Sequence, residues 1–472
     1  MNGAMRAARS IAALGAVLAG LVIFVVAVGA PSYQPRTFDF DLVAFYCGGA
    51  VTAEHHDPYR VEPLRSCEHR VGPVFRRGSP LAVPDPLPPY DQAFFAAVAH
   101  APYRVVQVAW FVALVAACAA TAFLIAELCA LPVAAVAAVL AISELYCSAL
   151  LGQIVPFCVL GIVTAGWALE RGKRGLTGAG LLLGMTEPHI GLPALAAVFL
   201  WHARSRVAVA IVGASLAVAS LVVAPPQQLA EYFSSVIPAH AWSEINNQEQ
   251  FSLAYVLHLC GVPETLALQL AKVEYAVMLV LGLVVARGAS QRFGLAMLPF
   301  CATAFVLVGG PFLHVTQMVA ALPAAFVLAG RANSRVAAVA VCVLSVPWID
   351  YATVLTVLPL AAGASYYAVR SFLPALRPVY GLGFAALGIA FVMAASFAVA
   401  VAPHPGMPAY GPVGPGALAE TTWRALIDMQ QQGHVVLSAL AKVPTLCAVL
   451  GIAAVAVRSA ALNPPPAFAD HP

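Results

Sequence analysis

The residues best suited to chemistry begin near position 39, in the segment DFDLVAFYCGGAVTAEHHDPY. Carboxylates stand at both ends of this apolar and aromatic run, with Asp39 and Asp41 first and Asp57-Pro58-Tyr59 last. A partly desolvated carboxylate is a better base than an exposed one, so such an acid suits the removal of a proton from a hydroxyl group. The simpler interpretation is an amphipathic helix, capped by acids, that lies along a membrane surface.

Two further polar residues interrupt the apolar stretch 175–201, where Glu187-Pro188-His189 stands near its middle. Proline and polar side chains at that depth favour a broken helix that borders a polar cavity. Glu187 and His189 either pair with each other and with nearby backbone, or serve a substrate.

Candidate binding residues also lie in two later segments. Asn247 and Gln248 precede an apolar run, where their amides suit hydrogen bonds to sugar hydroxyls, although a helix N-cap explains Asn247 equally well. His314 stands at the outer end of an expected span, as a site residue or as an ordinary helix-end histidine.

Several classes of function lack support in the sequence. There is no HExxH motif, no acidic pair with metal-ligand spacing and no phosphate-cradling glycine loop, so we expect no metal, cofactor or nucleotide site. The formal charge of +3 is scattered, which gives no indication of nucleic-acid binding.

The elements that must position these residues are membrane helices. Hydrophobic residues make up 61% of the 472 positions and charged residues only 10%. Apolar stretches of roughly 18–25 residues recur, and a stretch of that length crosses a bilayer as a helix. The expected fold class is therefore all-α, a polytopic transmembrane helix bundle. The expected later spans lie near 105–129, 133–151, 154–169, 207–224, 266–286, 293–309, 315–330, 336–349, 352–369, 380–402 and 436–457.

The basic residues indicate how the chain is organised across the membrane. We expect residues 1–30 to contain an uncleaved first helix, with a signal peptide as the alternative. In either case we expect 31–104 to form a long loop outside the cytoplasm that carries interfacial helices. The positive-inside rule then places the later basic clusters in the cytoplasm only if 175–201 is a re-entrant broken hairpin. We expect a core at 105–330, C-terminal helices at 331–458 and a disordered tail at 459–472. Cys47 and Cys67 both lie in the outer loop, where a disulfide is one expectation.

The order of several motifs resembles glycosyltransferase family 87, whose members have the GT-C fold and resemble polyprenol-phosphate-mannose-dependent mannosyltransferases. Asp41, Tyr46 and Asp57-Pro58-Tyr59 match the family's early pattern. Further similar pieces follow in order: PLPPYDQAFFAAVAHAP (86–102), LLGQIVP (150–156), AGLLLGMTEPHIGLP (179–193), NNQEQFSL (246–253) and GGPFLHVTQMVAALP (309–323). One difference is Glu187-Pro188, where the family commonly has Lys-Pro.

The resemblance implies a membrane glycosyltransferase that moves mannose or a related sugar from a polyprenyl-phosphate donor to an extracytoplasmic glycolipid or glycan. It also implies a multi-pass protein of the bacterial inner membrane. Asp41 is then the expected general base, and the expected substrate-binding residues are His314, Asn247, Gln248, Tyr59, Asp57 and His189. Arginine suits the donor phosphate, and the arginines expected outside are Arg36, Arg60, Arg65, Arg70, Arg76, Arg77, Arg104 and Arg424.

A secondary transporter is the alternative, because a helix broken by Glu187 and His189 resembles the discontinuous helices of transporters. Such a protein should carry a second, matching broken pair, and the sequence has no counterpart. The concentration of polar residues in one early outer loop favours the enzyme.

Overall fold

The computed structural model describes residues 40–72, 81–140, 143, 148, 151–247, 249–345, 413–431 and 435–461. The secondary structure in these ranges is helical, apart from two isolated bridges that pair Arg60 with Leu418 and Gln250 with His314. The expected all-α class is therefore confirmed. The expected spans at 11–30, 352–369 and 380–402 lie outside the described residues, as do Asp39 and Gln248.

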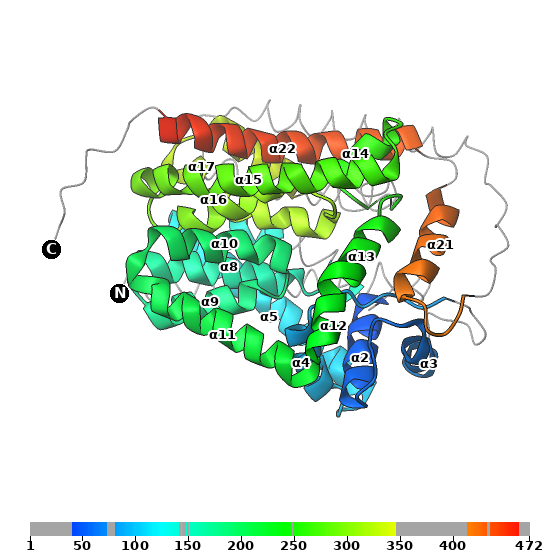
Figure 1. The fold of residues 1–472 in the computed structure, drawn as a ribbon. Coiled ribbons are helices and arrows are strands. Elements are labelled where there is room, and N and C mark those ends of the chain that lie inside the picture. The colour runs from blue at the N-terminus through cyan, green and yellow to red at the C-terminus, as the bar shows by residue number, and fades with distance from the viewer. Residues whose placement is uncertain are drawn as a thin grey trace.

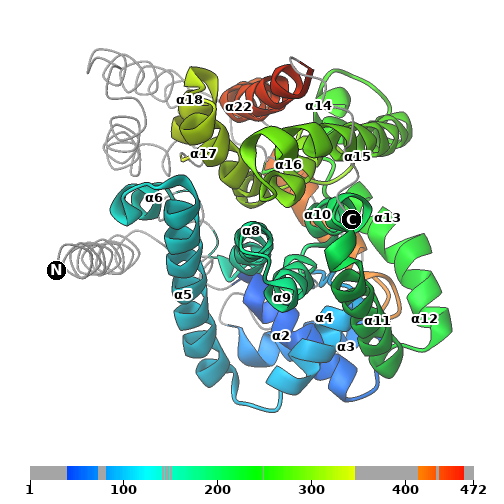
Figure 2. The ribbon, with the colours of Figure 1, turned by 90° about the vertical axis from the view of Figure 1, so that its left-hand side faces the viewer.

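Long apolar helices form the body of the protein and run side by side (Figure 1). In chain order they are α5 (Tyr103–Cys129), α6 (Val133–Leu140), α8 (Val155–Glu170), α9 (Arg174–Gly184), α10 (Pro188–Trp201), α11 (Arg206–Val223), α15 (Glu264–Phe293), α16 (Met297–Val306), α17 (Leu322–Arg331), α18 (Arg335–Leu344) and α22 (Val435–Ala461). Viewed along the helices, α8 lies at the centre, between α5 on one side and α10 and α16 on the other (Figure 2). α22 continues to Ala461, so the expected tail begins later than residue 459.

The outer surface of this bundle is apolar. In the part of the chain that the structure describes, four segments are long and apolar enough to cross a membrane: Tyr103–Cys129, Ala203–Val223, Glu264–Phe293 and Lys442–Ala461. Large apolar side chains point away from the protein along them, including Val207, which is 73% exposed, and Val273, which is 61% exposed. Contiguous apolar surface of this kind requires lipid around it, as the composition predicts.

Shorter helices gather at one end of the bundle. They are α2 (Phe40–Ala53), α3 (Val61–Val71), α4 (Pro89–Val98), α12 (Pro226–Glu231), η3 (Tyr232–Val236), α13 (Ile237–Ser243), α14 (Leu253–Leu259), η4 (Val315–Ala321) and α21 (Ala419–Gln431). The expected amphipathic character of the 39–59 segment is wrong, because eight consecutive residues of α2, Leu42–Gly49, are buried. Packing against α3 and α4 covers this helix on more than one face.

A disulfide joins α2 to α3 through Cys47 and Cys67, so the bond expected between these residues is confirmed. A cross-link of this kind stabilises a fold mainly by restricting the unfolded chain.

We expect the double variant Cys47→Ala/Cys67→Ala to lose about 3 kcal/mol of the free energy of unfolding, because the closed loop spans about 20 residues. Thermal unfolding in detergent measures the loss, with Cys260→Ala, an exposed free thiol, as the control. Two free thiols in unreduced peptides of the unmodified protein would contradict the bond.

The 175–201 segment is two helices with a break between them. α9 ends at Gly184 and α10 begins at Pro188. Glycines allow this break to press against its neighbours: a Cβ on Gly161 of α8 would lie 2.3 Å from Gly184 N, and a Cβ on Gly191 would lie 2.1 Å from Gly184 O. The turn after α10, η2 (Ala203–Ser205), contacts α9, so the two ends of the segment lie together.

This return of the chain is the geometry of the expected hairpin, and its sidedness is testable. We expect Arg174→Cys and Arg204→Cys to react with an impermeant thiol reagent only from the cytoplasmic side, in a protein whose exposed Cys260 and Cys447 are replaced by serine. Labelling of the two positions from opposite sides of the membrane would exclude the hairpin.

Candidate functional site

Asp41 lies in the first turn of α2 and is partly exposed. Gln153 Nε2 donates a hydrogen bond to Asp41 Oδ2. The residue before it, Gly152, has φ = +77°, and a Cβ there would lie 2.6 Å from Leu42 Cβ. Glycine is therefore required for the 151–154 turn to approach α2, which places Gln153 beside Asp41.

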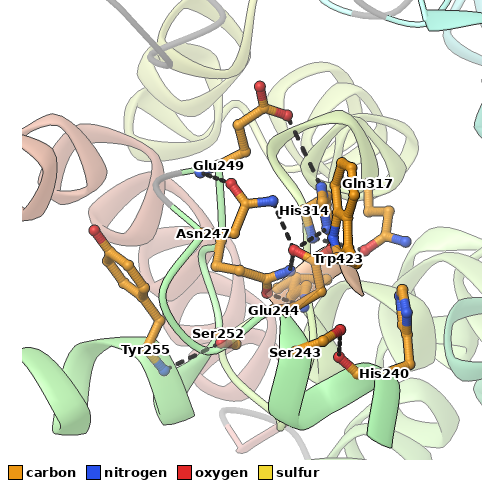
Figure 3. A network of polar contacts seen from close by, with 12 residues as sticks. His240, Ser243, Glu244, Asn247, Glu249, Ser252, Tyr255, His314, Gln317 and Trp423 are labelled. Carbon is orange, nitrogen blue, oxygen red and sulfur yellow. Dashed lines mark hydrogen bonds and ion pairs between the residues drawn. The ribbon is translucent and has the colours of Figure 1, made fainter. Parts of the chain in front are cut away.

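His314 is held by the loop that precedes α14. Phe251 N donates to Leu313 O at 2.6 Å and Val315 N donates to Glu249 O at 3.1 Å, so the loop and the 313–315 segment pair through their backbones. His314 Nε2 lies 3.3 Å from Glu244 Oε2, and Nδ1 lies 4.0 Å from Glu249 Oε2 (Figure 3). The histidine thus stands between two carboxylates.

Glu244 is the centre of this network, with only 2% of its surface exposed. Asn247 Nδ2 donates to its Oε2 at 2.6 Å, and Gln250 Nε2 donates to the same oxygen at 3.4 Å. Trp423 Nε1, from α21, donates to Oε1 (Figure 3). Several donors from distant parts of the chain therefore converge on one buried carboxylate.

Burial and neighbouring charges shift the pKa values of Asp41, Glu244 and His314. Burial raises the pKa of Asp41 to about 7, although the charge of His314 and the hydrogen bond from Gln153 lower it. Burial alone would raise the pKa of Glu244, but His314 and the Asn247 hydrogen bond bring it down to about 2. Burial would lower the pKa of His314, yet Glu244, Glu249 and Asp41 together raise it. Near neutral pH this arrangement favours an imidazolium close to a carboxyl group that can exchange a proton.

The break before α10 joins the same network. Gln317 Nε2 donates to Glu187 Oε2 at 3.3 Å, while Gln317 Oε1 accepts from the backbone N–H of His314 at 2.8 Å. His189 Nδ1 lies 3.6 Å from Glu187 Oε2, and its ring packs edge-on against Phe312, 5.8 Å away. Glu187 therefore connects the broken hairpin to the turn that carries His314.

The predicted site residues separate into two groups. His314, Asn247 and His189 belong to the network of hydrogen bonds and ion pairs described above. Asp41 is bonded to Gln153 and interacts with His314 through its charge, whereas Gln248 lies outside the described residues. Asp57 and Tyr59 have other partners.

Those partners are protein groups of the same 31–104 segment. Asp57 Oδ2 accepts from Arg60 Nε at 2.8 Å, and Tyr59 OH donates to Leu87 O at 2.9 Å. Tyr59 is only 3% exposed. Substrate contact by these two residues stays a prediction.

The arginines that the sequence offered for a phosphate are largely engaged elsewhere. Arg60 pairs with Asp57 and Glu231, and Arg65 pairs with Glu62 at 2.7 Å. Arg424 pairs with Glu264 at 2.6 Å and with Asp428 at 2.8 Å. Arg36, Arg76 and Arg77 lie outside the described residues. Among the residues that the structure describes, no group of three or more His, Cys, Asp or Glu side chains is placed to hold a metal ion.

The sequence did not single out Gln153, Glu244, Gln317 or Trp423 as site residues. Gln153 and Gln317 stand inside segments that already carried the family resemblance, so those segments were a usable signal. Glu244 lies just before the Asn246-Asn247 pair, and nothing in the sequence marks it. Trp423 reaches the site from α21, far along the chain, and no local pattern predicts that contact.

Comparison with known proteins gives one match. Residues 88–311 match the model described as Glycosyltransferase family 87. No curated protein and no solved structure matches the chain. The matched segment contains Gln153, Glu187 and Glu244, while Asp41 and His314 lie on either side of it. The match covers slightly under half of the chain. Together with the helical structure and the four candidate membrane spans of the described residues, it indicates a membrane glycosyltransferase similar to glycosyltransferase family 87.

Proposed function

We propose that the protein transfers mannose or a related sugar from a polyprenyl-phosphate donor to an extracytoplasmic glycolipid or glycan acceptor, with Asp41 as the general base. The observation that supports this proposal is a carboxylate held by Gln153, at Asp41, together with a histidine held between two carboxylates, at His314. The charges of Asp41 and His314 also shift each other's pKa. A base and a cation in one site suit a reaction that removes a proton and releases a phosphate.

The proposed step is a single displacement. The acceptor hydroxyl gives its proton to Asp41 while its oxygen forms a bond to the anomeric carbon of the sugar. The bond from that carbon to the phosphate oxygen breaks, and polyprenyl phosphate leaves with the electron pair. Gln153 orients Asp41, and the imidazolium of His314 stabilises the negative charge that grows on the phosphate.

Donor groups near the two residues support sugar binding. The Asn247 and Gln250 amides and the Trp423 indole surround Glu244. Amides and aromatic rings can bind sugar hydroxyls and ring faces when a substrate enters. The apolar surface of the bundle would hold the polyprenyl chain, in the cytoplasmic membrane of a bacterial cell with the site on the outer side.

The donor class is testable with purified protein. We expect transfer from at least one member of a panel of polyprenyl-phosphate sugars and none from the corresponding nucleotide sugars, in the presence of a membrane glycolipid fraction as acceptor. Transfer from a nucleotide sugar alone would contradict the proposed donor.

The pH dependence of transfer reports on the base. Because burial raises the pKa of Asp41 to about 7 and a base must be unprotonated to act, the rate should rise about tenfold per pH unit below pH 7 and level off above it, until loss of the His314 proton lowers the rate on the alkaline side. Measurement of kcat/KM from about pH 5 to about pH 9 tests this. A rate that is already independent of pH below about pH 6 would show that Asp41 does not act with this pKa.

A further inference from the structure

A cleft lined by arginines opens far from the proposed active site. Its volume is about 580 Å³, and its walls are the ends of α15 and α22 and the turn between α17 and α18. α15 is 30 residues long, about 45 Å, and begins at Glu264, whose carboxylate accepts from Trp242 Nε1 at 3.1 Å beside the Glu244 loop. The cleft lies at the other end of this helix, where Arg292 and Phe293 line it. Figure 1 shows how far α15 extends along the bundle.

The cleft is strongly positive. Four arginines line it: Arg292, Arg331, Arg335 and Arg458. Arg331 pairs with Glu170 at 2.9 Å, and Arg292 Nη1 donates to the backbone oxygen of Ser459 at 3.0 Å. Within the described ranges, neither Arg335 nor Arg458 forms an ion pair with a carboxylate. Glu170 therefore balances only one of the four charges.

The amino end of α18 adds to this charge. Ser334 caps the helix by accepting from Ala337 N at 3.2 Å, and Ser334, Arg335 and Val336 all line the cleft. The first N–H groups of a helix carry partial positive charge and attract anions. Guanidinium groups beside such a helix end match the oxygens of a phosphate in charge and in geometry.

Apolar side chains border the same cleft. Val336, which is 51% exposed, and the half-buried Val455 both line it. In a membrane protein these side chains face acyl chains, while the arginines beside them lie at headgroup level. The positive-inside rule places this end of α15, α18 and α22 at the cytoplasmic surface.

We propose that this cleft binds a phosphate ester, and that its apolar border selects one carried by an anionic lipid. Bound there, a headgroup would connect the ends of α15, α18 and α22. The site is independent of the sugar-transfer reaction and does not rest on its chemistry.

The test compares two double variants that remove the same charge. Arg335→Gln/Arg458→Gln changes the cleft, and Arg174→Gln/Arg204→Gln changes two exposed arginines elsewhere. Purified protein is titrated with phosphatidylglycerol in phosphatidylcholine nanodiscs, and retained lipid is counted by native mass spectrometry. We expect the cleft variant to bind phosphatidylglycerol at least tenfold more weakly, and the control to match the unmodified protein. Thermal unfolding without added lipid checks that both variants fold.

A second arm separates the two sources of phosphate. Inorganic phosphate at millimolar concentration should not displace the lipid if the apolar border contributes to binding. Displacement by inorganic phosphate would support the phosphate site and assign it to a soluble ester. Equal phosphatidylglycerol binding by the cleft variant and the unmodified protein, or equal binding of phosphatidylcholine, would overturn the proposal.

Discussion

Replacement of Asp41 by asparagine should lower the rate of sugar transfer by about 10²–10⁴-fold, the usual contribution of a general base. Asparagine keeps the size of the side chain and an oxygen that can accept from Gln153. It removes the group that takes the acceptor's proton. Binding of the donor lipid should change little, because the side chain that holds the phosphate is not altered.

Two controls make the Asp41→Asn result specific. Asp39→Asn alters the neighbouring acid of the same sequence pattern and should have a milder effect. The Cys47–Cys67 disulfide, read by peptide mapping, reports whether α2 keeps its place in the variant. Transfer by a folded Asp41→Asn protein at the unmodified rate would remove Asp41 from the mechanism.

Glu244→Gln should lower both the stability of the protein and the rate of sugar transfer, the rate by less than Asp41→Asn does. Glutamine offers one acceptor oxygen where the carboxylate offers two, and its NH₂ group would face the donors of Asn247 or Trp423. Removal of one partner from a buried charged network costs about 3–5 kcal/mol. We expect a lower unfolding temperature, and transfer reduced by about 10–100-fold because His314 loses the charge that orients and protonates it.

A pH profile separates this positioning role from simple destabilisation. Glu244 raises the pKa of His314, so its removal lowers that pKa. If transfer requires the imidazolium, activity of Glu244→Gln should therefore fall at a lower pH on the alkaline side than activity of the unmodified protein. Glu54→Gln, which alters an exposed carboxylate just after α2, is the matched control. An unchanged alkaline limb in Glu244→Gln would mean that Glu244 acts on stability alone.

The helices could be predicted from the sequence because lipid imposes both their length and their composition. α5, α11, α15 and α22 overlap the expected spans, since each contains an apolar stretch long enough to cross a bilayer. α8 also overlaps an expected span, although it is shorter, with 16 residues. The burial of α2 could not be predicted in the same way. α3, α4 and other parts of the chain pack against α2. The sequence of one helix does not show how many of its faces other elements will cover.

Several residues of the candidate site could be predicted from the sequence, but the residues that contact them could not. Asp41, Asn247, His189 and His314 stand out because polar residues are rare in this chain. The groups that join them are glutamines, a glutamate and a tryptophan from distant segments, and only tertiary structure brings these together.

The C-terminal helices illustrate the same limit. α21 contributes Trp423, which donates a hydrogen bond to Glu244. α22 contributes Lys442, whose Nζ lies 4.6 Å from the centre of the Phe251 ring in the loop that holds His314. Nothing within either helix predicts these contacts.

The amounts of the two reaction products test whether sugar is transferred from a lipid-linked donor at the site of Asp41 and His314. Proteoliposomes are prepared with a polyprenyl-phosphate sugar as the only donor, and both products are quantified for the unmodified protein and for Asp41→Asn. We expect the unmodified protein to release polyprenyl phosphate and glycosylated acceptor in equal amounts, and the Asp41→Asn variant to release almost none of either. Equal product from both proteins, or no product from the unmodified protein with any such donor alongside coupled solute uptake, would contradict it.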